Sequence, residues 1–262
     1  MPEGDTVWRT AQHLDRALSG KTLVETDFRV PAHATLDLAG RPVVGTASRG
    51  KHLLTRIGDE HTLHTHLKME GSWHLYKPGS RWRRPAHEAR VVLRTEDWTA
   101  VGFALGVCEV LLRAAEDTVV GHLGPDLLGP DWDEAEAVRR LLADPERPVA
   151  DALLDQRNLA GIGNMYKSEL CFLAGVSPSL PIGEVPDLPR LVRRAQHMLE
   201  VNKHRVEQVT TGDLRRGQQT WVFRRDKQPC RRCGTRVEVA MQGPQMQERA
   251  TYWCPHCQPR PT

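Results

Sequence analysis

Four cysteines near the end of the chain constrain its fold more than any other feature. Cys230 and Cys233 form one Cys-x-x-Cys pair, and Cys254 and Cys257 form a second pair after twenty intervening residues. Two such pairs place four thiolates within reach of one tetrahedral metal ion. The insert is β-prone at residues 237–239, so we predict a β-hairpin held together by one structural zinc ion. A metal with four protein ligands has no open position, and we expect it to do no chemistry.

The remaining composition indicates a cytoplasmic protein with an anionic partner. No apolar run approaches about 18 residues, so we expect no membrane span, and we expect no signal peptide. In such a chain, Cys108 and Cys171 are predicted to be inert buried thiols. The net charge is +3, but residues 216–262 hold nine Lys or Arg against three Asp or Glu. This local excess predicts a polyanion as partner of the C-terminal part.

A helix is predicted close to the start of the chain. Apolar residues recur there at steps of four, three and four: Val7, Ala11, Leu14 and Leu18. Asp5 or Thr6 is predicted to cap the helix, and residues 19–20 (Ser-Gly) to end it. Pro2 and Glu3 would then project from a helix N-terminus, where anions are favoured.

Pro2 is a candidate nucleophile. It is small enough that Met1 is expected to be removed, which leaves a secondary amine at the N-terminus. An α-amino group titrates near about pH 8, so part of it is nucleophilic at neutral pH. Its attack on a sugar aldehyde carbon gives an iminium ion, an electron sink for elimination. Glu3 is placed to move protons. The alternative is an ordinary chain start.

Short β-prone runs fill residues 22–103 and predict an antiparallel sandwich or barrel-like unit. The runs lie at residues 23–24, 43–44, 53–54, 73–75, 91–93 and 101–103. Residues 48–54 are typical of a tight turn leading into a strand, with Lys51 at its edge. Met69 is either a core residue or an exposed apolar tip that enters a base stack. His61, His64 and His66 lack an acidic or Cys partner in the sequence, which disfavours a metal there.

The second half of the chain is predicted to be helical. A Gly- and Pro-rich junction at residues 124–130 precedes four candidate helices, at residues 133–143, 149–159, 165–174 and 187–209. The predicted helix at residues 187–209 has its apolar residues along one face, which predicts that this face lies in the core. The glycine turn at residues 161–164 is either a phosphate clamp or a packing turn. Arg249 precedes the second cysteine pair and suits forked phosphate contact.

Together these motifs resemble the formamidopyrimidine-DNA glycosylase/endonuclease VIII family. The matching segments are Pro2-Glu3, residues 48–51, residues 66–69, Gly163-Asn164 and the four-cysteine hairpin. The resemblance implies an α+β fold: an N-terminal antiparallel β-sandwich lobe (residues 1–124), a helix–two-turns–helix domain (125–219) and a β-hairpin zinc finger (220–262). Damaged double-stranded DNA, or alternatively single-stranded DNA, would bind in the cleft, and the protein would be a monomer.

The resemblance also implies an activity and its catalytic residues. Pro2 would attack C1′ of the damaged nucleotide, Glu3 would assist sugar ring opening and proton transfer, and Lys51 would contact the lesion phosphate and donate a proton. The implied enzyme is a bifunctional DNA glycosylase and abasic-site lyase that removes oxidised bases, pyrimidines favoured, by Schiff-base β,δ-elimination. The alternatives are a non-catalytic damaged-DNA-binding zinc-finger protein and, less favoured, a zinc-dependent hydrolase.

For DNA binding, the resemblance implies four residues. Asn164 and Arg249 would bind phosphate, and Met69, beside Lys68, would fill the gap left by the flipped base. Residues 101–107 lack the Pro-Arg-Arg-Phe-Gly stretch of the formamidopyrimidine branch, which supplies two further wedge residues. This favours the endonuclease VIII-like branch, although Glu70 stands where a Tyr is typical, and Asp5-Thr6 where Pro-Glu is usual. The lesion-pocket loop is expected around residues 210–219.

Overall fold

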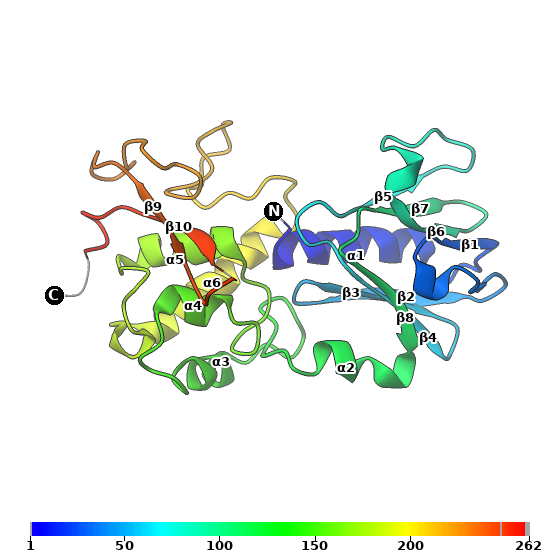
Figure 1. Cartoon of the computed structure of the whole chain (residues 1–262), viewed down its shortest axis with the longest axis horizontal. Helices are drawn as coiled ribbons and strands as arrows, with labels where there is room; N and C mark the ends of the chain where they lie inside the picture. Colours follow the sequence, from blue (N-terminus) through cyan, green and yellow to red (C-terminus); the bar gives the residue numbers. More distant parts are fainter. Residues whose placement is uncertain (1, 247, 260–262) are drawn as a thin grey trace. The chain divides into compact units, whose positions relative to one another are not determined.

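The computed structural model describes residues 2–246 and 248–259, and Met1 lies outside this described part of the chain. The chain divides into two compact units, residues 1–122 and 123–262. Each unit combines helices with antiparallel strands, so the predicted α+β fold is confirmed (Figure 1). The further division of the second unit at residue 219 stays a prediction. None of the helices described has the length and apolar character that a membrane span requires.

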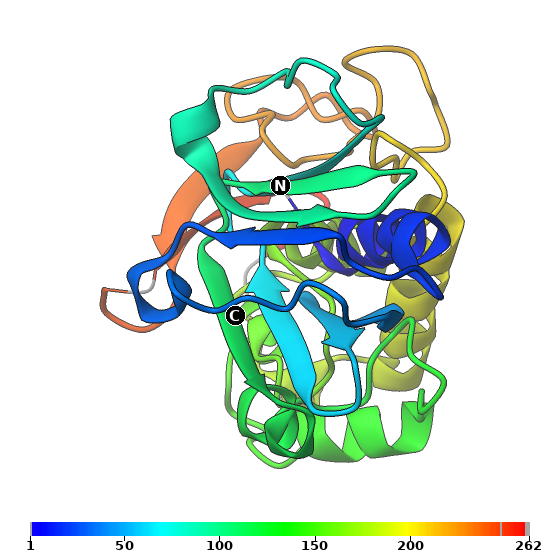
Figure 2. The same ribbon diagram turned by 90° about the vertical axis from the view of Figure 1, so that its right-hand side faces the viewer.

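The first unit is a sandwich of two antiparallel sheets, which Figure 2 shows as two layers. One sheet has the order β1-β6-β7-β5, formed by β1 (Glu25–Phe28), β5 (Ser72–Tyr76), β6 (Ala89–Arg94) and β7 (Thr99–Phe103). The other has the order β2-β3-β4-β8, formed by β2 (Val43–Arg49), β3 (His52–Ile57), β4 (His61–His66) and β8 (Val107–Leu112). Short helical segments are η1 (Pro31–His33), η2 (Ala86–Glu88), η3 (Arg113–Ala115) and α2 (Asp117–Val120).

The first helix, α1 (Gly4–Leu18), packs against both sheets. Its predicted apolar face is confirmed, since all four of its residues are buried in one core with residues of β3 and β6. The predicted cap was wrong. The helix begins at Gly4, the extended residue Glu3 precedes it, and Asp5 lies inside the first turn, where its carboxylate accepts the Thr6 N–H at 2.7 Å. The end at Ser19, followed by Gly20 with φ +74°, is as predicted.

Two features of the sandwich differ from the sequence prediction. Residues 23–24 were predicted as a strand, but β1 begins at Glu25, and Leu23 is instead a buried residue outside the strands. Strand β8 was not predicted. Its apolar residues lie on both faces, with Cys108 and Val110 on the face against the core and Val107 and Leu111 on the opposite face, so it lacks the alternation that marks a half-buried strand.

The second unit is a helical cluster followed by a hairpin. Its elements are α3 (Glu134–Leu141), α4 (Val149–Leu154), α5 (Asn164–Ala174), η4 (Ile182–Glu184), α6 (Leu188–Asn202), β9 (Glu238–Gln242) and β10 (Arg249–Trp253). The apolar stripe of α6 is buried against α3 and α5, as predicted. β9 and β10 form an antiparallel pair in which Arg249 lies opposite Gln242.

Helices α4 and α6 are shorter than the sequence predicted. The prediction for α4 ran to residue 159, but the helix ends at Leu154 because Asp155 leaves the helical conformation and binds Arg147 and Arg157. The prediction for α6 ran to residue 209. It ends at Asn202, whose buried side chain donates to Met198 and Val209 carbonyls and accepts the Val209 N–H at 2.8 Å. These side-chain contacts turn the chain where the periodicity would continue.

We predict that Leu14→Ala lowers the free energy of unfolding of the first unit by about 2–5 kcal/mol. Leu14 is 1 % exposed, and its removal leaves a cavity between α1 and the sheets. Urea denaturation of the full chain measures the change. Val24→Ala, at a position that is 54 % exposed, is the control and should change stability by less than about 0.5 kcal/mol. Equal effects of the two substitutions would contradict the packing described.

Candidate functional site

The N-terminal residues occupy a fixed place at the start of α1. Pro2 is half-buried and Glu3 is buried. The Glu3 carbonyl accepts the Val7 N–H at 3.0 Å, the first hydrogen bond of the helix, while its side chain does not cap it. The positive end of the helix dipole therefore lies beside Pro2 and disfavours positive charge there.

Lys51 lies in the tight turn that the sequence predicts. Gly50 and Lys51 form the two-residue connection between β2 and β3, since Arg49 pairs with His52 across it. Gly50 has φ +55°, a conformation that two-residue hairpin turns require and that glycine adopts without strain. The turn places the half-buried Lys51 at one end of the second sheet.

Beside Lys51 the structure places a chain of hydrogen-bonded side chains that the sequence did not reveal. His52 Nδ1 lies 2.8 Å from His64 Nε2, and His64 Nδ1 lies 2.8 Å from the Glu109 carboxylate. An ionised carboxylate only accepts, so His64 donates to Glu109 and accepts from His52. The prediction that His61, His64 and His66 lack an acidic partner was therefore wrong for His64: Glu109 is its partner, contributed by the unpredicted strand β8.

Burial keeps the imidazoles of His52 and His66 neutral. It lowers the pKa of His52 to about 3, with the nearby basic groups of His66, His64, His122 and Lys51 adding to the effect. Burial likewise lowers the pKa of His66 to about 4, with Lys68 and Lys51 adding to the effect. A neutral His52 can donate through Nδ1 while Nε2 stays an acceptor, so its orientation and tautomer are both fixed.

The loop between β4 and β5, residues 67–71, projects an apolar tip. Met69 is 62 % exposed, which excludes the core position that the sequence left open. Lys68 has φ +51°, and its N–H donates to His66 Nδ1 at 2.9 Å. Gly106 packs so closely against Lys68 that a Cβ there would lie 2.2 Å from Lys68 Cγ. These contacts give the loop one defined conformation.

In the second unit the structure brings two of the predicted site residues together. Asn164 is the first residue of α5, and its Nδ2 donates to the carbonyl of Ala250 in β10 at 2.8 Å. Ala250 follows Arg249, an exposed residue, so the start of α5 and Arg249 lie side by side. Backbone N–H groups of a helix N-terminus and a guanidinium both bind phosphate oxygens.

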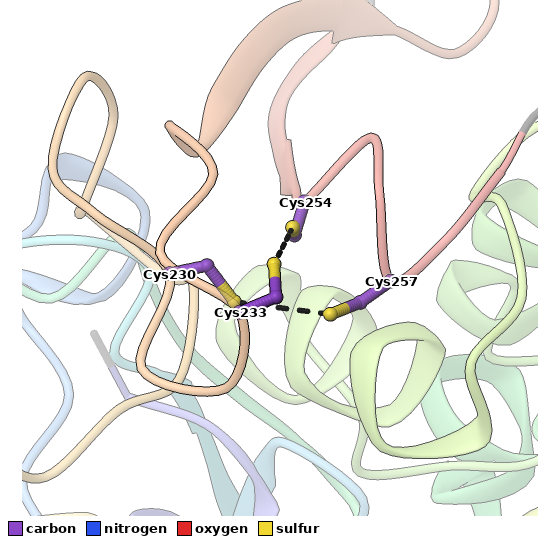
Figure 3. A group of neighbouring side chains, drawn as sticks. All are labelled: Cys230, Cys233, Cys254 and Cys257. Carbon is purple, nitrogen blue, oxygen red and sulfur yellow. Dashed lines mark hydrogen bonds between the residues drawn. The ribbon is translucent and has the colours of Figure 1, made fainter.

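The four cysteines form one cluster, shown in Figure 3. The Sγ atoms of Cys230 and Cys257 lie 4.0 Å apart, and those of Cys233 and Cys254 lie 3.5 Å apart. Four sulfurs about 2.3 Å from a central ion would be separated by about 3.8 Å, so the cluster fits a tetrahedral metal ion. It is the group of side chains found among residues 2–246 and 248–259 that could hold a metal ion, and four thiolate ligands would leave no open position.

Buried charged groups of α5 attach this cluster to the helices, and sequence reasoning missed them. Glu169 is buried and accepts the N–H groups of Trp221, Val222 and Phe223 at 2.8–2.9 Å, and also the Thr210 hydroxyl. Burial raises its pKa, and these hydrogen bonds oppose that rise. The signal in the sequence was a lysine and a glutamate, Lys167 and Glu169, within a helix whose other residues are mostly apolar.

Arg231, between the first two cysteines, binds the predicted pocket loop. Its guanidinium donates to the carbonyls of Thr220 at 2.9 Å and Gly217 at 2.5 Å, and also to the Gln218 side chain. The two ends of the loop are joined by a hydrogen bond in which the Thr210 N–H donates to the Gln219 carbonyl at 2.8 Å. The conformation of residues 210–220 is therefore coupled to the four-cysteine cluster.

An antiparallel sandwich behind an N-terminal helix, with a helical unit that carries a four-cysteine hairpin, defines the class of helix–two-turns–helix DNA glycosylases. The chain belongs to the formamidopyrimidine-DNA glycosylase/endonuclease 8 family. Residues 1–104 match the formamidopyrimidine-DNA glycosylase N-terminal domain, and residues 123–208 match the H2TH domain of the same glycosylase.

Relatives and solved structures support this assignment over the whole chain. A probable endonuclease 8 2 from Streptomyces coelicolor is 56% identical, covering 100% of this chain and 95% of the relative. A protein from Mycolicibacterium smegmatis named DNA-(apurinic or apyrimidinic site) lyase Nei2 is 50% identical, covering 98% and 99%. The fold is shared with Lactococcus lactis formamidopyrimidine-DNA glycosylase, solved with DNA containing an abasic site (TM-score 0.81, 20% identity, 99% and 100% covered).

We predict that the ring signals of His52 and His66 do not titrate between about pH 8 and pH 5. Their lowered pKa values keep both imidazoles neutral over this range. NMR titration of the ring C–H signals, assigned with His52→Gln and His66→Gln, measures this. A midpoint for His52 near its ordinary value of 6.5 would contradict the burial described.

Proposed function

We propose that the protein is a bifunctional DNA glycosylase and abasic-site lyase of base-excision repair. The observation that carries this proposal is the Pro2-Glu3 segment directly before α1, in a chain that matches endonuclease 8 relatives along its whole length. The closed four-cysteine cluster does not serve a metal-dependent hydrolysis, because it offers no open coordination position.

The reaction follows from the chemistry of a secondary amine. With Met1 removed, the Pro2 nitrogen attacks C1′, the C1′–N bond to the base breaks, and the base leaves with a proton. The sugar ring opens to an iminium ion, with Glu3 assisting proton transfer. The iminium withdraws electrons from C2′, so loss of a C2′ proton expels the 3′ phosphate, and a second elimination expels the 5′ phosphate. Water hydrolyses the iminium and releases Pro2, leaving a one-nucleotide gap.

Lys51 is proposed as the group that contacts the lesion phosphate and donates a proton. The neutral His52 that follows Lys51 supports this role, because it places no competing positive charge beside the Lys51 ammonium. The Glu109 carboxylate, in turn, holds the pair formed by His52 and His64 in one tautomer.

DNA binding is proposed to use both units. Asn164 and Arg249 bind backbone phosphates, supported by the hydrogen bond from Asn164 to the carbonyl of Ala250, the residue that follows Arg249. Met69, carried with Lys68 on a loop of defined conformation, enters the space left when the damaged nucleotide leaves the stack. We propose oxidised pyrimidines and abasic sites as substrates, and one Zn²⁺ as the structural ion of the cysteine cluster.

We predict that borohydride traps a covalent complex between the protein and abasic-site DNA. Borohydride reduces the iminium to a stable amine, and the complex is seen as a band of lower mobility in a denaturing gel. An uncleaved N-terminal extension should abolish trapping, and Pro2→Gly, which replaces the secondary amine with a primary amine, should weaken it.

The matched control carries the same extension at the C-terminus and should trap like the native chain. Equal trapping with a blocked N-terminus would contradict the role of Pro2. Failure of the native chain to nick or trap abasic-site DNA that it binds would instead favour a non-catalytic damage-binding protein.

We predict that the purified chain holds about one zinc ion, and that Cys257→Ser loses it. Elemental analysis measures the metal, and Cys108→Ala, outside the cluster, is the control that keeps it. Removal of the metal should raise hydrogen exchange in residues 220–259 and, through Arg231, in residues 210–220. Exchange in α1 should not change. Unaltered exchange at residues 210–220 would contradict the coupling.

A further inference from the structure

The connection between β5 and β6 carries an unusual density of positive charge. Residues 77–88 contain Lys77, Arg81, Arg83 and Arg84 against a single acidic residue, Glu88. Residues 80–86 of this connection line a hollow of about 580 Å³. We call residues 80–86 the arginine loop. None of the motifs assigned to the proposed reaction includes it.

The arginine loop has a fixed shape that does not depend on the guanidinium groups of Arg81 and Arg83. The Arg83 backbone N–H donates to the Tyr76 hydroxyl at 3.0 Å. Trp82 packs edge-on against Phe103 with ring centroids 5.7 Å apart. The Arg29 guanidinium lies over the Trp82 ring, with its Cζ 5.5 Å from the ring centroid, and its Nη1 donates to the Ala86 carbonyl at 3.0 Å. The backbone is therefore held from the sheet side.

Arg81 and Arg83 extend from this fixed backbone as exposed residues. In the described part of the chain, no carboxylate forms an ion pair with either guanidinium, whereas Arg84 pairs with Glu88 at 2.5 Å. Two like charges at neighbouring positions repel each other, and an anionic partner removes that repulsion. A guanidinium also matches phosphate oxygens in a forked geometry.

Arg84 joins the arginine loop to the loop that carries Met69. Its Nη1 donates to the Glu70 carbonyl at 3.0 Å and to the Ser72 hydroxyl at 2.9 Å. The exposed Met69 tip is therefore one residue away from a backbone group that the arginine loop binds. A ligand that Met69 contacts therefore also lies close to the arginine loop.

We propose that Arg81 and Arg83 bind phosphates of the DNA backbone beside the nucleotides that Met69 reaches. This inference rests on the proposed function and deepens it, because it adds a contact surface on the first unit. Residues 101–107 lack the two further wedge residues of the formamidopyrimidine branch, and Glu70 would repel phosphate. Two guanidinium groups on the loop whose Arg84 binds the Glu70 carbonyl offset that repulsion and fix the DNA backbone near Met69.

The test measures binding of the full-length chain to a duplex that contains a tetrahydrofuran abasic analogue. The analogue lacks the C1′ hydroxyl group and cannot open to an aldehyde, so it binds without reacting. Fluorescence anisotropy gives Kd between about 50 and 200 mM KCl, where each phosphate contact contributes about 0.9 to the slope of log K against log salt. Arg81→Ala/Arg83→Ala should lower the magnitude of the slope by about 1.8, and Arg81→Lys/Arg83→Lys should restore it.

The matched control is Lys21→Ala/Arg94→Ala, which also removes two positive charges from the first unit. Lys21 and Arg94 pair with Asp97 and Glu25 in ion pairs of 2.6 Å, and neither belongs to a proposed DNA contact. This variant should keep the native slope. Thermal unfolding followed by circular dichroism verifies that both alanine variants are folded.

Two results would overturn the inference: an unchanged slope for the Arg81 and Arg83 variant, or an equal loss of slope in the control, which would indicate only a net-charge effect. Failure of the proposed function is a separate outcome. In that case the native chain itself neither prefers the abasic duplex nor forms a borohydride-trapped complex.

Discussion

The burial of one face of α1 against both sheets is the interaction on which the candidate catalytic centre depends. A chain terminus normally frays, because few contacts hold it. Here Val7, only five residues after Pro2, is 1 % exposed in the core of the sandwich. The helix therefore fixes the direction in which Pro2 leaves the fold. A nucleophile held in place reacts with a bound sugar at a much higher effective concentration than a mobile one.

The hairpin of the second unit is attached to the helices by polar contacts more than by a large apolar core. The hairpin and its cysteines share only a small apolar cluster with α5, centred on Phe172. Glu169 adds three backbone hydrogen bonds, and Lys167 donates to the Thr251 hydroxyl at 2.7 Å. Removal of one partner from such buried contacts leaves a desolvated polar group, which costs about 1–3 kcal/mol. Their directionality sets the position of Arg249 and of residues 210–220.

The sequence predicted elements whose signal is local and failed where a remote contact decides. The faces of α1 and α6 were predicted because a 3.6-residue period is visible in any window of the chain. The ends of α4 and α6 were misplaced because Asp155 and Asn202 end them through side-chain contacts. Strand β8 was missed because both of its faces carry apolar residues, and Glu109 was missed with it.

The sequence by itself determined the chemistry available to this protein: a proline behind the initiator Met, four thiolates in paired spacing, and basic residues near the end of the chain. These are properties of single residues and short spacings, so no fold is needed to see them. Only the tertiary structure decided which groups meet, as Glu109 meets His64, Ala250 meets Asn164 and Arg84 meets Glu70. Each of these contacts joins segments that pack together although they lie apart in sequence, and packing of that kind leaves no local pattern.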